Sequence, residues 1–135
     1  MSTDGARGEP ASTGDDFVSL IGLRLTDRSE SEVRYELDVE PRLMNPYGTL
    51  HGGVVYSLAD TSMGGALEGA LGENELTATI EIKINYLAPV RDGTVHCITR
   101  ILKRGKRIAT LESDVYNGDR MVAKALGSFA IFEVQ

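Results

Sequence analysis

The chain has 135 residues, a formal net charge of −6 and 41% apolar residues, so it is long enough for a single domain with a hydrophobic core. The negative charge argues against a general affinity for nucleic acids, because binding to phosphates requires clustered cations. No stretch approaches the roughly 18 consecutive apolar residues that a membrane-spanning helix needs.

Residues 1–16 are predicted to be a disordered N-terminal tail, and residues 17–135 to form the single domain. The tail is rich in Gly, Ser, Thr and Asp and has no apolar segment, so it resembles neither a signal peptide nor a packed element. Without an export signal, the expected compartment is the cytoplasm. The single cysteine, Cys97, is predicted to be a buried structural thiol. With only His51 and His96 in the chain, a metal site is not expected.

The domain is predicted to open with a short helix and two strands. Residues 17–25 are predicted to form a short amphipathic helix that bends at Gly22 and runs into a first strand. Residues 32–39 alternate charged and apolar side chains, which is typical of a half-buried strand with one solvated face. Pro41 is expected to end this strand.

A long helix is predicted to begin after Gly53 and to end near residues 69–72. The Asn45-Pro46 pair and Gly48 form a loop before it, because proline restricts the preceding residue and glycine frees the backbone. Small or apolar residues fall on more than one face of this helix, as is typical of a buried helix. Asp60 lies in its middle, where an unpaired carboxylate is costly to bury.

Four further strands are predicted, at residues 77–87, 94–102, 108–116 and 121–134. In the first, Ile80 and Ile82 alternate with Thr79 and Glu81, so the two pairs are expected on opposite faces. Turn residues separate the four strands, and we therefore expect an antiparallel meander. The element order predicts an α+β fold, with a strongly curved antiparallel sheet wrapped around one long apolar helix.

Gly52 and Gly53 lie where the long helix is expected to begin. A helix N-terminus presents unpaired N–H groups and a positive dipole end, and glycine lets a ligand approach the backbone closely. Together these features suit a carbonyl oxygen that becomes an oxyanion. His51 precedes them as a candidate hydrogen-bond donor or helix cap. The alternative is that the two glycines only allow tight packing of the helix on the sheet.

Asp60 lies eight residues beyond Gly52, which is about 12 Å along a straight helix. A carboxylate that attacks a carbonyl at Gly52, or activates water toward it, must lie within about 3–3.5 Å of the reacting atoms. One chain cannot satisfy this condition, but two antiparallel helices in a homodimer can, and symmetry then creates two sites. The alternative is a buried structural carboxylate, salt-bridged or capped by the hydroxyls of Ser57 or Thr61.

Asn45 and Thr79 are further candidates for the same site. Asn45 could orient water or substrate with its amide, although Asn before Pro is common in turns. Thr79 could orient a water with its hydroxyl, although most strand threonines have no such role. Ser57 and Ser62 lack a Ser/His/Asp context, so a serine hydrolase is disfavoured.

The stretch from Asn45 to Asp60 resembles the signature of hotdog-fold acyl-CoA thioesterases, with Asn-Pro-Tyr-Gly-Thr-Leu-His-Gly-Gly followed by Leu-Ala-Asp. The likeness is greatest to the phenylacetate-degradation (PaaI) and acyl-CoA thioesterase 13-like branch. The segments at residues 85–89 and 103–106 also fit, and the resemblance covers about residues 17–134. It implies a curved antiparallel sheet around a central helix. It also implies a homodimer with a continuous sheet, often paired again into a dimer of dimers, a homotetramer.

The resemblance also implies roles for single residues. The aspartate matching Asp60 acts as nucleophile or general base, and the N–H matching Gly52 polarises the thioester carbonyl. The residues matching Asn45 and His51 position water and the thioester. A hydroxyl matching Thr79 assists the water in some members.

A basic turn like Arg104-Gly105-Lys106 helps to hold the phosphates of coenzyme A in that family. One related branch places Glu at the acid position with Thr four residues later. Here the later position is Gly64, so the role of that threonine is not transferred.

The predicted function is therefore hydrolysis of an acyl-CoA to a carboxylic acid and coenzyme A, at a site shared across a dimer interface. No metal or redox cofactor is expected, since coenzyme A is part of the substrate, and neither nucleic acid nor membrane is an expected partner. Two alternatives stay open. One is hydration or dehydration of an enoyl- or hydroxyacyl-CoA, which the nine-residue spacing from His51 to Asp60 fits poorly. The other is a non-catalytic acyl-CoA-binding module. The sequence does not specify the acyl group.

Overall fold

The computed structural model describes residue 14 and residues 16–134, which form one six-stranded antiparallel sheet and one long helix. The predicted tail, residues 1–16, lies outside the described residues except for Gly14 and Asp16. No helix in the described part combines the length and apolarity needed to cross a membrane. The elements in chain order are α1 (Phe17–Ile21), β1 (Arg24–Arg28), β2 (Glu32–Asp38), η1 (Pro41–Leu43), α2 (Gly52–Glu68), β3 (Glu75–Tyr86), β4 (Thr94–Arg104), β5 (Ile108–Asn117) and β6 (Arg120–Glu133).

Helix α1 is short because its two ends are fixed by the local sequence. Asp16, which we expected at the end of the tail, is its N-cap and accepts a hydrogen bond from the Ser19 N–H at 2.9 Å. Gly22 ends the helix in the left-handed conformation with φ of 77°. The predicted bend at Gly22, between a short helix and a first strand, is confirmed.

The strand order is β1-β2-β4-β5-β6-β3, so the prediction that the last four strands form one meander is wrong for β3. Strands β4, β5 and β6 are consecutive neighbours, but β3 pairs with β6 at the edge and β4 pairs with β2. The segment from β3 to β4 crosses the sheet end, where the N–H groups of Leu87 and Ala88 donate to the Val122 carbonyl. Val90 is buried in this segment, and its carbonyl accepts from the Leu50 N–H. Its turn residues therefore belong to a packed crossover.

A β-bulge at Ile80 decides which side chains of β3 face the helix. The pairing of β3 with β6 is irregular between Thr79 and Glu81, which leaves Ile80 as the extra residue. The side-chain alternation therefore shifts by one position, and Thr79 faces α2 together with Ile82. The predicted placement of these two residues on opposite faces is corrected by the bulge.

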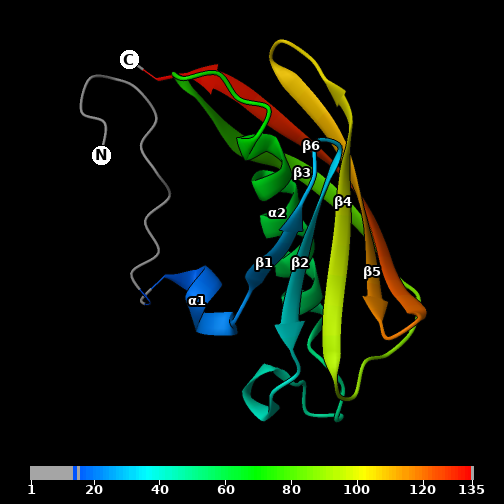
Figure 1. Cartoon of the computed structure of the whole chain (residues 1–135). Coiled ribbons are helices and arrows are strands. Elements are labelled where there is room, and N and C mark those ends of the chain that lie inside the picture. Colours follow the sequence, from blue (N-terminus) through cyan, green and yellow to red (C-terminus); the bar gives the residue numbers. More distant parts are fainter. Residues whose placement is uncertain (1–13, 15, 135) are drawn as a thin grey trace.

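Helix α2 lies in the curve of the sheet, as Figure 1 shows, and contacts strands β2 to β6. Its inner face is apolar and includes Leu58, Met63 and Leu67, all fully buried. Burial of each such side chain is worth about 1.5–3 kcal/mol, so this face holds the helix in place. The opposite face is only partly covered and carries Asp60, so α2 is not buried all round in the single chain.

A buried hydroxyl network fixes the rotation of α2 about its axis. The Thr99 hydroxyl on β4 donates to Ser62 Oγ at 2.8 Å and lies 2.6 Å from Ser113 Oγ. Ser62 is two residues beyond Asp60, so the two side chains point about 200° apart around the helix. Holding Ser62 against the sheet therefore directs Asp60 away from it. Cys97 beside this network is fully buried, as predicted, and burial raises the pKa of its thiol.

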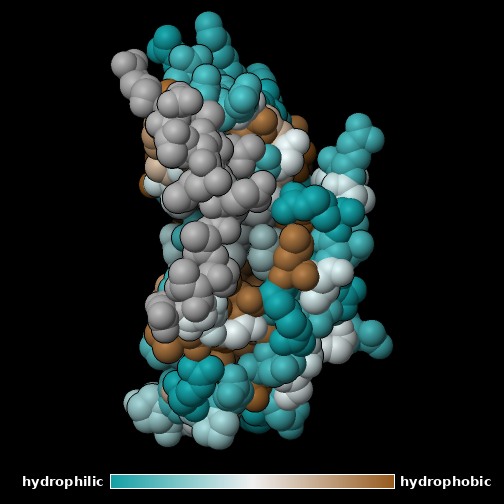
Figure 2. Space-filling model, turned by 60° about the vertical axis from the view of Figure 1, so that its left-hand side comes forward, coloured by the Kyte–Doolittle hydropathy of each residue, from teal (hydrophilic) through white to brown (hydrophobic). Residues whose placement is uncertain are grey.

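Large apolar side chains stay exposed along β3 and α1. Ile80 and Tyr86 on β3 are 53% and 52% exposed, and Phe17 and Leu20 on α1 also face outward. Figure 2 brings forward the side that lies to the left in Figure 1, where apolar areas reach the surface between polar ones. Strand β3 is an edge of the sheet, with one row of backbone groups unpaired by any described strand. An exposed apolar edge of this kind favours pairing with another chain.

Candidate active site

The first turn of α2 leaves the N–H of Gly52 unpaired. His51 is the N-cap, with Nδ1 accepting from the Gly53 N–H at 2.8 Å and its carbonyl accepting from the Val54 N–H at 2.9 Å. No described group accepts from the Gly52 N–H. The carbonyl and N–H of one trans peptide point in opposite directions. Because the His51 carbonyl points into the helix, the Gly52 N–H points outward beyond its N-terminus.

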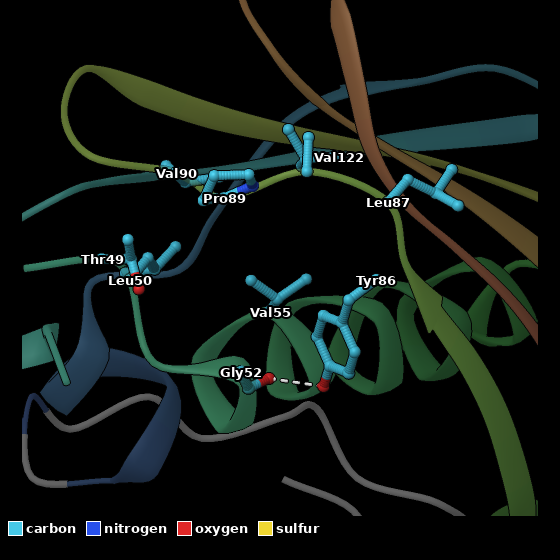
Figure 3. A pocket seen from close by; sticks show the side chains of 10 residues that line it. Thr49, Leu50, Gly52, Val55, Tyr86, Leu87, Pro89, Val90 and Val122 are labelled. Atoms are coloured by element: carbon cyan, nitrogen blue, oxygen red, sulfur yellow. Dashed lines mark hydrogen bonds between the residues drawn. The ribbon is translucent and has the colours of Figure 1, made fainter. Parts of the chain in front are cut away.

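Close neighbours leave little room for a side chain at either glycine. A Cβ on Gly52 would lie 3.3 Å from Cζ of Tyr86, and one on Gly53 would lie 3.0 Å from Nδ1 of His51. The Tyr86 hydroxyl donates to the Gly52 carbonyl at 2.7 Å, as Figure 3 shows. Partial burial, with the nearby Tyr56, raises the pKa of Tyr86. The glycines thus serve tight side-chain packing and, at Gly52, also leave an N–H accessible.

A cavity of about 380 Å³ lies beside Gly52. Its apolar wall is formed by Leu50, Val55, Leu87, Pro89, Val90 and Val122 (Figure 3). No lining residue is charged, and the two lining hydroxyls are both engaged. Thr49 accepts from the Asn45 amide at 2.7 Å, and Tyr86 donates to Gly52. This volume is at the small end of the roughly 300–1,000 Å³ of small-molecule pockets, and it suits a compact apolar group next to a carbonyl held by Gly52.

Asp60 and Thr79 come together on the open face of α2. The Thr79 hydroxyl donates to Oδ1 of Asp60 at 2.7 Å. Among residues 16–134, no Lys or Arg forms an ion pair with Asp60, and no hydrogen bond reaches its Oδ2. This half-buried carboxylate therefore has one oxygen held by a neutral donor and one free to accept from water. The alternative partners for Asp60, Ser57 and Thr61, are not used, since Ser57 donates to the Gly53 carbonyl.

The candidate residues fall into two separate groups within one chain. Gly52 lines the cavity at the helix start, with His51 next to it in the chain, whereas Asp60 lies about two turns further along the helix and does not line the cavity. The axial separation of Gly52 and Asp60 on the straight helix is about 12 Å. One chain therefore does not bring its own carboxylate to its own Gly52 N–H.

The Asn45 side chain is used within the loop before α2. Its Oδ1 accepts from the N–H groups of Tyr47 and Thr49, at 2.9 and 3.2 Å, and its Nδ2 donates to the Thr49 hydroxyl. Asn45 does not line the cavity beside Gly52. In the single chain, its amide shapes the turn that carries Thr49 to the cavity wall.

The predicted phosphate-binding turn gives its two cations different settings. Arg104 donates to the Ala70 and Gly105 carbonyls at 3.2 and 2.7 Å and pairs with Glu75, whose pKa is lowered by the Gly72 N–H and then by Arg104. Lys106 is exposed, and no described carboxylate pairs with it. The turn lies beyond the C-terminal end of α2, far from Gly52 in the same chain (Figure 1). Lys106, rather than Arg104, is the cation available to a ligand.

Gly105 serves the geometry of this turn. A Cβ at Gly105 would lie 2.6 Å from the Ile108 carbonyl oxygen, which accepts from the Gly105 N–H at 2.9 Å.

No cluster of three His, Cys, Asp or Glu side chains suited to a metal ion occurs in residues 14 and 16–134. Tyr86 was missed as a site residue, because in the sequence it stands out only as a strand residue within the segment at residues 85–89.

Comparisons with known proteins identify the family. A family model described as the thioesterase superfamily matches residues 47–124, more than half of the chain. The chain belongs to the thioesterase superfamily, and its curved sheet around one long helix is the hotdog fold predicted from the resemblance. It is a hydrolase of the thioesterase class, which disfavours the non-enzymatic alternative.

Solved structures support the same assignment. The conserved protein PA5202 from Pseudomonas aeruginosa is 36% identical with a TM-score of 0.82, over 86% of this chain and 93% of that one. The thioesterase HI1161 from Haemophilus influenzae is 26% identical with a TM-score of 0.85, over 88% and 84% of the two chains. A mutant of the phenylacetic acid degradation protein PaaI from Thermus thermophilus, at 23% identity, shares the fold with a TM-score of 0.78, over 84% of this chain and 96% of that one.

Proposed function

We propose that this protein hydrolyses acyl-CoA thioesters to a carboxylic acid and free coenzyme A, as a homodimer. The observation that carries the proposal is the unpaired Gly52 N–H, aimed outward from a helix N-terminus beside an uncharged apolar cavity. A backbone donor fixed in this way stabilises the oxyanion that forms when a thioester carbonyl is attacked. The reaction uses no metal or redox cofactor, and coenzyme A is part of the substrate.

The cavity favours an uncharged acyl group. Its lining has no charged side chain, so no ion pair is available to a carboxylate at the far end of an acyl chain. Burying an unpaired charge there would be costly. The proposed substrates are therefore aryl or short- to medium-chain acyl-CoA esters. Dicarboxylic acyl-CoA esters are disfavoured.

The carboxylate is proposed to come from the partner chain. If two α2 helices lie antiparallel with Gly52 of one beside Asp60 of the other, they cross near Tyr56, midway between the two residues. Small side chains on the open face of α2, at Gly53 and Ser57, allow close approach of a second helix. The unpaired edge of β3 supports the continuous sheet implied by the family resemblance. A dimer of dimers remains part of this proposal.

In the proposed mechanism, Asp60 of one chain attacks the thioester carbonyl bound by the other chain, or activates a water that does. Thr79 holds Oδ1 of Asp60, which leaves Oδ2 for the reaction. Direct attack forms a mixed anhydride on Asp60, which water then hydrolyses to release the carboxylic acid and restore the carboxylate, whereas attack by water gives the acid without this intermediate. On either route the acyl C–S bond breaks, and the coenzyme A thiolate leaves and takes up a proton that comes from the water. Because Nδ1 of His51 accepts from Gly53, the proton of a neutral imidazole lies on Nε2, which is free to donate to the thioester or water.

The basic turn is proposed to reach the site of the other chain as well. It lies next to Ala70, at the end of α2 opposite to Gly52, so antiparallel helices with Asp60 beside the partner's Gly52 place Ala70 about 15 Å beyond that glycine, on the outer side of the partner's site. Lys106 is the proposed contact to the phosphates of coenzyme A, while Arg104 shapes the turn. The cytoplasmic location stays a prediction from the sequence.

A complementation experiment tests the shared site. Gly52→Pro removes the key N–H with little damage to the helix, because proline is tolerated at the first helical position and His51 is already extended, with ψ of 133°. Asp60→Asn removes the carboxylate. We expect each variant alone to release almost no thiol from acyl-CoA. Co-expressed, the two should recover about a quarter of wild-type activity, because half the dimers are mixed and each mixed dimer has one intact site.

Gly52→Ala is the matched control, since it adds the same Cβ against Tyr86 but keeps the N–H. It should retain clearly more activity than Gly52→Pro. Mixed dimers without recovered activity would contradict sharing of the site. A wild-type protein that releases no thiol from a panel of neutral acyl-CoA esters would contradict the proposed function, and an enoyl absorbance assay on the same samples would detect hydration instead.

A further inference from the structure

The peptide between Gly52 and Gly53 is held by side chains at both of its polar ends. Its carbonyl accepts from the Tyr86 hydroxyl at 2.7 Å, and its N–H donates to Nδ1 of His51 at 2.8 Å. The two side chains come from different elements, because Tyr86 ends strand β3 and His51 precedes α2. Figure 3 shows the Tyr86 ring over the start of the helix with its hydroxyl on Gly52.

This clamp matters because Gly52 has no side chain to restrict its backbone. Glycine at the first position of a helix has more conformational freedom than any other residue, and the first turn is where helices fray. The Tyr86 ring fills the space where a Cβ on Gly52 would lie. The ring and the hydroxyl together limit rotation at Gly52. A donor that stabilises developing charge is effective when it is fixed before the reaction.

Tyr86 is itself fixed by the sheet. The next residue, Leu87, donates its N–H to the Val122 carbonyl at 2.8 Å, which anchors the end of β3 to β6. The bulge at Ile80 leaves Thr79 and Tyr86 on the same side of β3, toward α2. One strand therefore supports both halves of the chemistry, the Asp60 carboxylate through Thr79 and the Gly52 N–H through Tyr86.

We propose that Tyr86 is a positioning residue for the oxyanion-binding N–H of Gly52, acting through the Gly52–Gly53 peptide. Its hydroxyl is committed to the Gly52 carbonyl and does not bind the substrate. The proposal rests on the thioesterase function proposed above. It adds Tyr86 to the residues that already have proposed roles in that function. It predicts that loss of one hydroxyl lowers the rate of the chemical step and leaves substrate binding intact.

Tyr86→Phe tests this proposal, because it keeps the aromatic wall of the cavity and removes only the hydroxyl. We expect kcat to fall about 3- to 10-fold, the range that one lost hydrogen bond gives, with KM nearly unchanged. Affinity for a trifluoromethyl ketone analogue of acyl-CoA, which mimics the tetrahedral state, should fall in parallel. Affinity for a thioether analogue without a carbonyl should not change. Tyr116→Phe, on the outer face beside His96, is the matched control and should change none of these values.

An unchanged kcat, a rise in KM alone, or equal weakening of both analogues would overturn the proposal. Amide hydrogen exchange at Gly53 gives a second readout that does not depend on turnover. Exchange should be faster in Tyr86→Phe than in wild type, and an equal rate would also overturn the proposal. Thiol release by the wild-type protein tests the proposed function. The ratio of kcat between Tyr86→Phe and wild type tests the role of Tyr86, so the two failures can be told apart.

Discussion

Two aspartates of this protein lie in opposite electrostatic settings. Asp114, on the outer face of the sheet, accepts from Lys124 Nζ at 2.6 Å and from Arg100 Nη1 at 3.1 Å. Burial favours a higher pKa for Asp114, but the hydrogen bonds from Lys124 and Arg100 outweigh it and the pKa is lowered. Asp60, on the open face of α2, accepts a hydrogen bond from the neutral Thr79 hydroxyl and has no ion pair with any described residue. The carboxylate with two cations is committed to the fold, whereas the one without a counter-charge is available for chemistry.

The largest expected effect is on catalysis. Asp60→Asn should lower kcat for acyl-CoA hydrolysis by about 10²- to 10⁴-fold, the usual cost of losing a general base. The thermal unfolding midpoint should stay near the wild-type value, because the side chain makes no ion pair among the described residues. Steady-state kinetics and calorimetry on the same preparation measure both. Near-normal turnover would remove Asp60 from the reaction.

The same substitution at Asp114 should lower stability and leave catalysis unchanged. Asp114→Asn keeps the shape but removes the charge that pairs with Arg100 and Lys124, and should lower the free energy of unfolding by about 1–3 kcal/mol. Activity per folded molecule should stay the same. Urea unfolding together with kinetics checks this. If Asp114→Asn lost kcat without losing stability, the assignment of Asp114 to the fold and of Asp60 to catalysis would be wrong.

The pH dependence of stability should differ between wild type and Asp114→Asn. The lowered pKa of Asp114 means that its contribution is fully present above the usual carboxyl pKa of about 4 and is lost as the pH falls through the lower folded value. The difference in unfolding free energy between the two proteins should therefore be constant near neutrality and shrink in acid. Urea unfolding at a series of pH values measures it, and a difference that grows in acid would contradict the assigned ion pairs.

The smallest expected effect concerns the basic turn. Lys106→Ala should raise KM for acyl-CoA by about two- to fivefold, as expected for one exposed ion pair, with no change in stability. KM for a short thioester that lacks the nucleotide should not change. Arg104→Ala should instead lower the unfolding midpoint, because it removes contacts to Ala70 and Glu75. Equal effects of Lys106→Ala on both substrates would exclude a contact to the coenzyme.

Local sequence signals were enough to predict the limits of the long helix. Gly52 and the capping residue His51 fix the start of α2, and Gly69 follows its last residue, close to the predicted limits. The distance between Gly52 and Asp60 follows from helix geometry alone, so the separation into two groups was predictable. Tight turns also identified β4, β5 and β6 as neighbours.

Long-range pairing was not predictable from those signals. The place of β3 beside β6 depends on residues far apart in the chain, and the residues of the crossover at Val90 look like turn residues in isolation. One inserted residue, Ile80, shifted the facing of Thr79. Arg104 contacts Ala70 and Glu75, and Tyr86 donates to Gly52. These tertiary contacts join residues far apart in the chain, so residue spacing in the sequence does not predict them.

The position of β3 also has a consequence for the order of folding. Strands β4, β5 and β6 are joined by short turns, so they can pair while the rest of the chain is unfolded. Strand β3 precedes them in the chain but adds to the far side of β6, and loop-closure entropy makes such non-local pairing slow. We therefore expect β3 to join the sheet in a late kinetic phase. Because β3 carries Thr79 and Tyr86, the hydrogen bonds from these residues to Asp60 and Gly52 would form last.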